Sequence, residues 1–95
     1  ASGFRLTVAM LRISTSPLFE RRYKKLAVPL KSKAKEKELL FREDPFHPSL
    51  NTHKLHGKDG ESWAFSIDRK YRIKFLFLSD SHALFLDVGT HDIYK

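Results

Sequence analysis

The spacing of apolar residues changes once along this chain, near Gly60, and that change limits the folds it can adopt. After Gly60, apolar and polar residues alternate over 61–67 and 71–78, which is the period of a strand with one buried face. A third apolar stretch, 83–88, follows another short polar connection. Short connections of this kind join antiparallel neighbours, so the sequence predicts a three-stranded antiparallel meander at the C-terminal end.

The region before Gly60 has helical spacing instead. Ser16 followed by Pro17 is typical of a helix start, because serine caps free N–H groups and proline is tolerated at the first helical position. Apolar residues then recur at helical spacing, at Phe19, Tyr23 and Leu26. A second helix is predicted over 29–44, and its narrow apolar stripe among many charges indicates a helix on the surface.

These predictions describe one α+β domain. An initial strand at 10–14 precedes the two helices, and the three predicted strands follow them. Segregated helices and strands favour a fold in which the N-terminal strand and the helix pair pack on a twisted antiparallel sheet. A chain of 95 residues, of which 41% are hydrophobic, suits a single domain over 10–95. Met10 is a suitable native start, so we interpret 1–9 as either a tag or a short extension.

The composition indicates a basic protein of the cytoplasm. Lysine and arginine number 18 against 11 acidic residues, which gives a net charge of +7. This imbalance favours polyanionic partners, nucleic acid first, although an acidic protein would meet the same field. The chain lacks cysteine and any apolar run long enough to cross a membrane, so we expect a soluble cytoplasmic protein. The lysines of 29–44 either contact phosphate or form a solvated helix face, and the solvated face is the favoured interpretation.

The alternation along 71–78 gives the first geometric constraint on a site. It places Arg72 and Lys74 on the face of the sheet that points away from the core. An antiparallel neighbour would bring 89–91 close to Arg72, so this arginine and the end of the chain are expected on one concave surface. In an alternative interpretation, Arg72 is structural and pairs with Asp87 on the neighbouring strand.

Several motifs, in this order and spacing, resemble one known family. They are RRYKKL, DPFHPSLNTHKLHG, SWAFSI, YRIKF and, at the end of the chain, LDVGTHDIY. Across roughly 10–95 the chain resembles the RelE/ParE superfamily of toxins from bacterial type II toxin-antitoxin systems. The resemblance implies a RelE-like fold, in which a small sheet packs on two N-terminal helices. In the RelE, YoeB and YafQ branches it also implies a ribosome-dependent mRNA endonuclease, whereas the ParE branch poisons DNA gyrase.

The resemblance suggests site residues, one position at a time. Arg72 matches a phosphate-binding arginine of RelE and YoeB. His91 matches a catalytic histidine of YoeB and YafQ, and Tyr94 resembles the C-terminal tyrosine of RelE and YoeB. His53 falls, by a gap-free count back from Arg72, where YafQ has a functional histidine. These four residues form the predicted catalytic set.

The chain also departs from the RelE and YoeB patterns. Two strand lysines of RelE appear here as Trp63 and Phe65, and the loop glutamate of YoeB falls at or near Ser49. We expect RNA contacts from Lys54, Trp63 and Lys74, because basic side chains bind phosphate and aromatic rings stack on bases. Packing in the core is the alternative for Trp63, since it shares the alternation of Phe65.

The predicted catalytic residues suit RNA cleavage by the 2′-hydroxyl. This reaction needs a base for the hydroxyl, a cation for the charged phosphorane and an acid for the departing 5′-oxygen. Arg72 suits the cation because its planar guanidinium grips two phosphate oxygens. His53 and His91 suit the two proton transfers, in an order that the sequence leaves open. Tyr94 either holds the phosphate, stacks on a base or covers the sheet edge.

The leading prediction is therefore a toxin-type endoribonuclease that cuts ribosome-bound mRNA and is held in check by a cognate antitoxin. The alternative is a ParE-like gyrase inhibitor, or an inactive member of the fold that binds RNA or protein. No metal or other cofactor is expected, because the spacing of His47, His53 and His56 fits no ordinary zinc site. The expected partners are the antitoxin, the ribosome and mRNA, and no membrane is among them.

Overall fold

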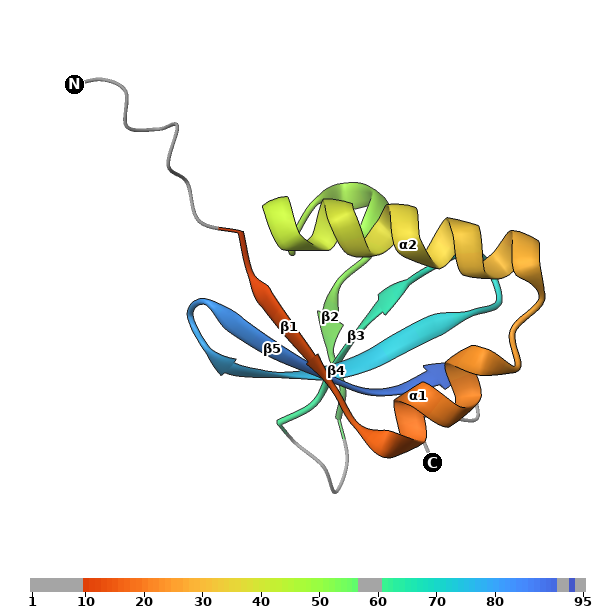
Figure 1. The fold of residues 1–95 in the computed structure, drawn as a ribbon. Helices are drawn as coiled ribbons and strands as arrows, with labels where there is room; N and C mark the ends of the chain where they lie inside the picture. Colours follow the sequence, from red (N-terminus) through yellow and green to blue (C-terminus); the bar gives the residue numbers. More distant parts are fainter. Residues whose placement is uncertain (1–9, 57–60, 91–92, 94–95) are drawn as a thin grey trace.

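The computed structural model describes residues 10–56, 61–90 and 93, and Figure 1 shows their arrangement. Within these residues the order of elements is β1 (Arg12–Thr15), α1 (Pro17–Lys24), α2 (Val28–Glu43), the 3₁₀ turn η2 (Pro48–Leu50), β2 (His53–Lys54), β3 (Trp63–Ser66), β4 (Arg72–Ser79) and β5 (His82–Gly89). The predicted order of one strand, two helices and three strands is confirmed. The two-residue strand β2 was not predicted.

The strands form one five-stranded sheet in the order β1-β5-β4-β3-β2. The predicted meander is confirmed, since β3 pairs antiparallel with β4 and β4 pairs antiparallel with β5. β1 pairs parallel with β5, which makes the sheet mixed and corrects the expectation of a wholly antiparallel one. The α+β class is unaffected. A parallel partner requires a long crossover, and here both helices lie in the connection that leaves β1.

Helix α1 begins where the sequence predicts. The Phe19 N–H donates to Ser16 Oγ at 3.0 Å, and Pro17 occupies the first helical position. The Ser16 hydroxyl in turn donates to the Leu86 carbonyl of β5 at 2.8 Å. The cap therefore also fixes the start of α1 against the sheet. None of the described helices is long and apolar enough to cross a bilayer.

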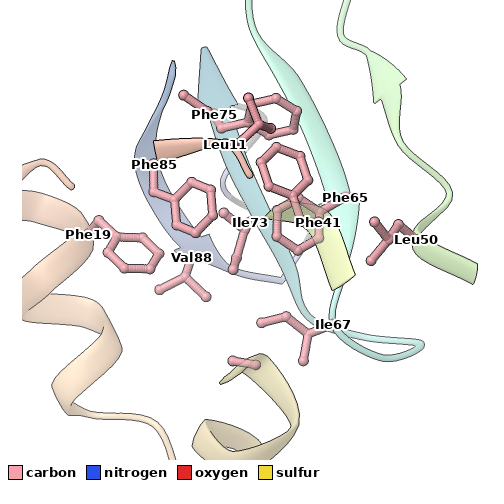
Figure 2. Packing of buried hydrophobic residues seen from close by; sticks show 12 residues of the cluster. Leu11, Phe19, Phe41, Leu50, Phe65, Ile67, Ile73, Phe75, Phe85 and Val88 are labelled. Carbon is pink, nitrogen blue, oxygen red and sulfur yellow. The ribbon is translucent and has the colours of Figure 1, made fainter. Parts of the chain in front are cut away.

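Both helices pack on the same face of the sheet (Figure 2). Phe41 of α2 is fully buried, and its ring centroid lies 4.7 Å from that of Phe65 and 4.8 Å from that of Phe75. Phe85 of β5 contacts Phe41 as well as Phe19 of α1. Aromatic pairs at these distances contribute beyond the area they bury. The core therefore lies between the helices and one sheet face, which leaves the opposite face for the remaining side chains.

An irregularity in β5 sets which residues meet at the start of β4. Lys74 is opposite Asp87, but Phe75 is opposite Phe85, so one extra residue lies between these pairs on β5. Beyond this bulge the register places Arg72 directly opposite Gly89. The predicted proximity of Arg72 and the end of the last strand is thus confirmed at Gly89.

Candidate functional site

Arg72 lies at the first position of β4, on the face of the sheet that the helices do not cover. The next residue of β4, Ile73, is buried in the core cluster, so Arg72 points to the opposite face of the sheet. Across the sheet it is flanked by Ser66 of β3 and Gly89 of β5. Its Nη1 donates to the Arg69 carbonyl at 3.3 Å, which turns the guanidinium toward the connection between β3 and β4.

That connection is a tight turn fixed by Asp68. The Asp68 Oδ1 accepts from the backbone N–H of Lys70 at 2.9 Å and of Tyr71 at 2.7 Å. The Ile67 N–H donates to the Tyr71 carbonyl at 2.8 Å and closes the turn. An aspartate that accepts hydrogen bonds from the backbone N–H groups of the residues after it is typical of turns. The turn therefore presents Arg69 and Lys70, both exposed, next to Arg72.

A hollow of about 840 Å³ opens between this turn and α2. We call it the basic hollow; its described lining consists of Lys33, Lys37, Ser49, Asn51, Ser66, Ile67, Asp68, Arg69, Lys70 and Arg72. Five of these side chains are cationic, and the single carboxylate already accepts two backbone hydrogen bonds. In Figure 1, the N-terminal part of α2 extends over the connection between β3 and β4. The charge of the basic hollow therefore suits an anionic ligand.

His53 lies on the same sheet face as Arg72. It pairs with Ala64, which pairs in turn with Lys74, and directly paired residues point to the same side. The Cα atoms of His53 and Arg72 are about 12 Å apart, because two strand spacings lie between β2 and β4 and Arg72 is two residues along β4 from Lys74. The Asn51 carbonyl lies 2.8 Å from His53 Nδ1. Because a carbonyl only accepts, Nδ1 carries a proton and the lone pair of the neutral ring is on Nε2.

Ile93 lies close to the end of β5. The Ile93 N–H donates to the Thr90 carbonyl at 3.1 Å, and Ile93 is only 3% exposed. A Cβ atom at Gly89 would lie 2.9 Å from Ile93 Cγ2, so this close approach requires glycine. His91 and Tyr94 lie outside the described residues, and their catalytic roles stay predictions.

The fold has clear counterparts among solved structures. A YoeB/ParE toxin from Agrobacterium tumefaciens matches with a TM-score of 0.72 and 13% identity, covering 85% of this chain and 99% of that one. A copper-bound mutant toxin from Helicobacter pylori matches with 0.72 and 24%, covering 90% and 100%. YafQ, in the DinJ-YafQ toxin-antitoxin complex of E. coli, matches with 0.70 and 18%, covering 88% and 96%. The chain adopts the RelE/ParE toxin fold. No family model matches it. No curated protein matches it by sequence.

Within this RelE/ParE fold, Asp87 does not serve Arg72. Its two carboxylate oxygens accept from Arg22 Nη1 of α1 at 2.9 and 3.1 Å, and Oδ1 also accepts from the Val88 N–H at 2.8 Å. The alternative in which Arg72 pairs with Asp87 is therefore wrong. Arg72 faces the basic hollow instead, where the only described carboxylate is Asp68.

Trp63 belongs to the helix side of the RelE/ParE sheet. It pairs with the buried Phe75, and its ring contacts Phe46 and Phe77 at centroid distances of 5.6 and 5.5 Å. Together these rings line a second hollow of about 660 Å³ below the end of α2. Lys54 pairs with Trp63 and so points to the same side. The alternation of the strand thus separates both residues from Arg72, while Lys74 shares the Arg72 face.

Four cations of the basic hollow are not among the predicted site residues. For Lys33 and Lys37 the sequence favours a solvated helix face over phosphate contacts, and Arg69 and Lys70 lie in a short connection between two predicted strands. Two features of the sequence point to these cations: Lys33 and Lys37 are four residues apart and so lie on one side of the helix, and the connection that holds Arg69 and Lys70 leads directly to Arg72. Their meeting could not be predicted, because it depends on how α2 crosses the sheet. Among residues 10–56, 61–90 and 93, no three His, Asp or Glu side chains form a group that could hold a metal ion.

Proposed function

We propose that this protein is the toxin of a type II toxin-antitoxin system and cleaves mRNA on the ribosome. One observation carries the proposal: Arg72 lies beside a strongly basic hollow, on a sheet face that it shares with His53 and the end of β5. A cationic surface next to groups that transfer protons is what RNA cleavage requires. The structural neighbours from Agrobacterium tumefaciens and E. coli, named as toxins, support the same proposal.

The proposed reaction is an attack of the ribose 2′-oxygen on the adjacent phosphorus. A base removes the 2′ proton, the new O–P bond forms, and the P–O5′ bond breaks as an acid protonates the departing 5′-oxygen. The products are a 2′,3′-cyclic phosphate and a 5′-hydroxyl end. Arg72 stabilises the charge of the phosphorane, and His53 and His91 carry the two protons. Tyr94 holds the phosphate, and none of these steps needs a metal ion.

The partner that restrains such a toxin is a cognate antitoxin. Solved neighbours include an archaeal RelE-RelB complex from Pyrococcus horikoshii and a YoeB-YefM complex from Staphylococcus aureus. By analogy, the basic charge of this chain suits an antitoxin segment of acidic character. The toxin would then act in the cytoplasm, where ribosomes and mRNA are found.

The test is cleavage of a defined message on stalled ribosomes, read by mapping new 5′ ends. Wild-type protein is expected to cut, Arg72→Ala and His91→Ala to lose about a hundredfold or more in rate, and Lys35→Gln, an exposed helix change, to retain the rate. Full cleavage by His91→Ala would remove that residue from the mechanism. No cleavage by wild-type protein, together with inhibition of DNA gyrase, would replace the proposal with the ParE-like alternative.

A further inference from the structure

Four cations of the basic hollow have no part in the proposed chemistry: Lys33, Lys37, Arg69 and Lys70. We propose that they form a backbone-binding channel that holds consecutive phosphates of the RNA strand next to the scissile linkage and leads this strand to Arg72. The inference rests on the proposed function only in one respect, namely that the RNA strand leads to the catalytic Arg72. The binding itself follows from the charge and shape of the basic hollow.

The first wall of the channel comes from α2. Lys33 and Lys37 are four residues apart, so their side chains leave the helix on one side, about 5–6 Å apart at Cβ. Ala34, between them, is 2% exposed and packs into the core, which fixes this side of α2 over the sheet. The two ammonium groups are therefore set in a row, as contacts with successive phosphates require.

The second wall comes from the turn between β3 and β4. The hydrogen bonds to Asp68 Oδ1 hold the backbone of this turn, so Arg69 and Lys70 project from a fixed base. The Arg69 carbonyl also accepts from Arg72. The turn and the proposed catalytic arginine are thus physically connected, and a phosphate held at the turn lies next to the one that Arg72 binds.

The lining also indicates what is recognised. Besides the cations it offers the polar side chains Ser49, Asn51 and Ser66, and no aromatic ring lies among its described residues. Aromatic faces are what single-stranded RNA sites use to stack bases, so this channel contacts the backbone and not the bases. RNA is favoured over an acidic polypeptide because Arg72, the proposed phosphate ligand of the reaction, lines the same hollow as the four cations. We expect the affinity of this channel to be nearly independent of RNA sequence.

The test measures binding of a 2′-O-methyl RNA of about ten nucleotides, which keeps every phosphate but lacks the attacking hydroxyl. Affinity is followed by fluorescence anisotropy over a range of salt concentrations. Each lost phosphate contact makes the negative slope of log K against log salt shallower by about 0.7 for a single strand, so K33Q/K37Q is expected to make it shallower by about 1.4. R69Q/K70Q is expected to do the same. K31Q/K35Q has the same helix, spacing and charge change outside the basic hollow, and should leave the slope unchanged.

Each outcome decides between the claims. If the slope of log K against log salt becomes shallower by the same amount for K33Q/K37Q and K31Q/K35Q, the channel is overturned and only a general basic charge remains. A K33Q/K37Q effect on binding of a poly-glutamate peptide, with none on RNA, would assign the hollow to an acidic polypeptide. Circular dichroism shows that each variant is folded. Because the RNA cannot be cleaved, the channel can be confirmed even if ribosome-dependent cleavage fails, and the reverse also holds.

Discussion

Arg22 of α1 and Arg72 of β4 have different roles because their surroundings differ. Arg22 gives both oxygens of Asp87 a hydrogen bond, and Asp87 is only 8% exposed. Arg72 contacts a backbone carbonyl and lines an open hollow. A buried carboxylate that loses its cation keeps the cost of its desolvation, whereas an exposed guanidinium can be removed with little effect on folding. Arg22 is therefore a stabilising residue, and Arg72 is available for a ligand.

Asp87→Asn tests this difference at the level of stability. The change removes the charge but keeps the shape, and it is expected to lower the free energy of unfolding by about 1–2 kcal/mol, a range reduced because the Arg22 side chain is 49% exposed. Arg72→Ala should stay within about 0.5 kcal/mol of wild type, as surface changes usually do. Urea denaturation measures both. A loss for Arg72→Ala as large as for Asp87→Asn would make Arg72 structural after all.

The sequence indicates the position of Arg72 but not the partner of Asp87. Alternation along β4 is a local pattern, and it correctly places Arg72 and Lys74 away from the core. The partner of Asp87 is Arg22, which is 65 residues away along the chain, so no local pattern contains the pair. Residues that meet only through the packing of a helix on a strand are therefore the ones that sequence analysis misses, Lys33 among them.

At the scale of elements, long alternating strands were predicted and short or distant pairings were not. β4 has eight residues, of which the first four alternate between partly exposed and buried, whereas β2 has only His53 and Lys54, both exposed, and shows no alternation to detect. The parallel pairing of β1 with β5 depends on the path of the intervening chain and not on the residues of β1. The two helices also differ in a way that can be tested, because α1 has a side-chain cap and α2 has none.

Ala27→Ser should stabilise α2. Ala27 is the N-cap, is exposed, and has the extended backbone angles φ −64° and ψ 150° that N-cap residues adopt. Its carbonyl accepts from both Leu30 and Lys31, so a serine oxygen could take the Leu30 N–H. We expect a gain of about 0.5–1 kcal/mol in the free energy of unfolding.

Ser16→Ala provides the opposite control for this prediction, since it removes the existing cap of α1 and the bond to Leu86. It should cost about 1–2 kcal/mol. Thermal and urea denaturation measure both variants. If Ala27→Ser lowers the stability, the present arrangement, in which the Ala27 carbonyl accepts from both Leu30 and Lys31, is the better one for this helix.

At the scale of the whole molecule, the sheet separates two surfaces. One carries Arg72, Lys74 and His53, and the other carries the helices and the aromatic cluster of Phe46, Trp63 and Phe77. The basic hollow lies at the edge between them, where Lys33 and Lys37 of α2 meet the turn between β3 and β4. Under the proposed function, the net charge of +7 would attract RNA to the molecule as a whole, and contacts at atomic distance would select one surface. RNA bound at Arg72 and the basic hollow, as proposed, would therefore lie away from Trp63.

Trp63 is the only tryptophan of the chain, so its fluorescence reports on its own surface alone. Titration with the uncleavable RNA is expected to leave its emission nearly constant while anisotropy of the labelled RNA shows saturation. The reason is that Trp63 lines the hollow at the end of α2, which shares no described lining residue with the basic hollow, so a base of the bound strand does not stack on the indole. Lys74→Gln should weaken RNA binding without changing the emission, and Trp63→Phe should leave the affinity unchanged. Strong quenching that follows the binding curve would place RNA on the aromatic surface and support the predicted contact of Trp63 with RNA.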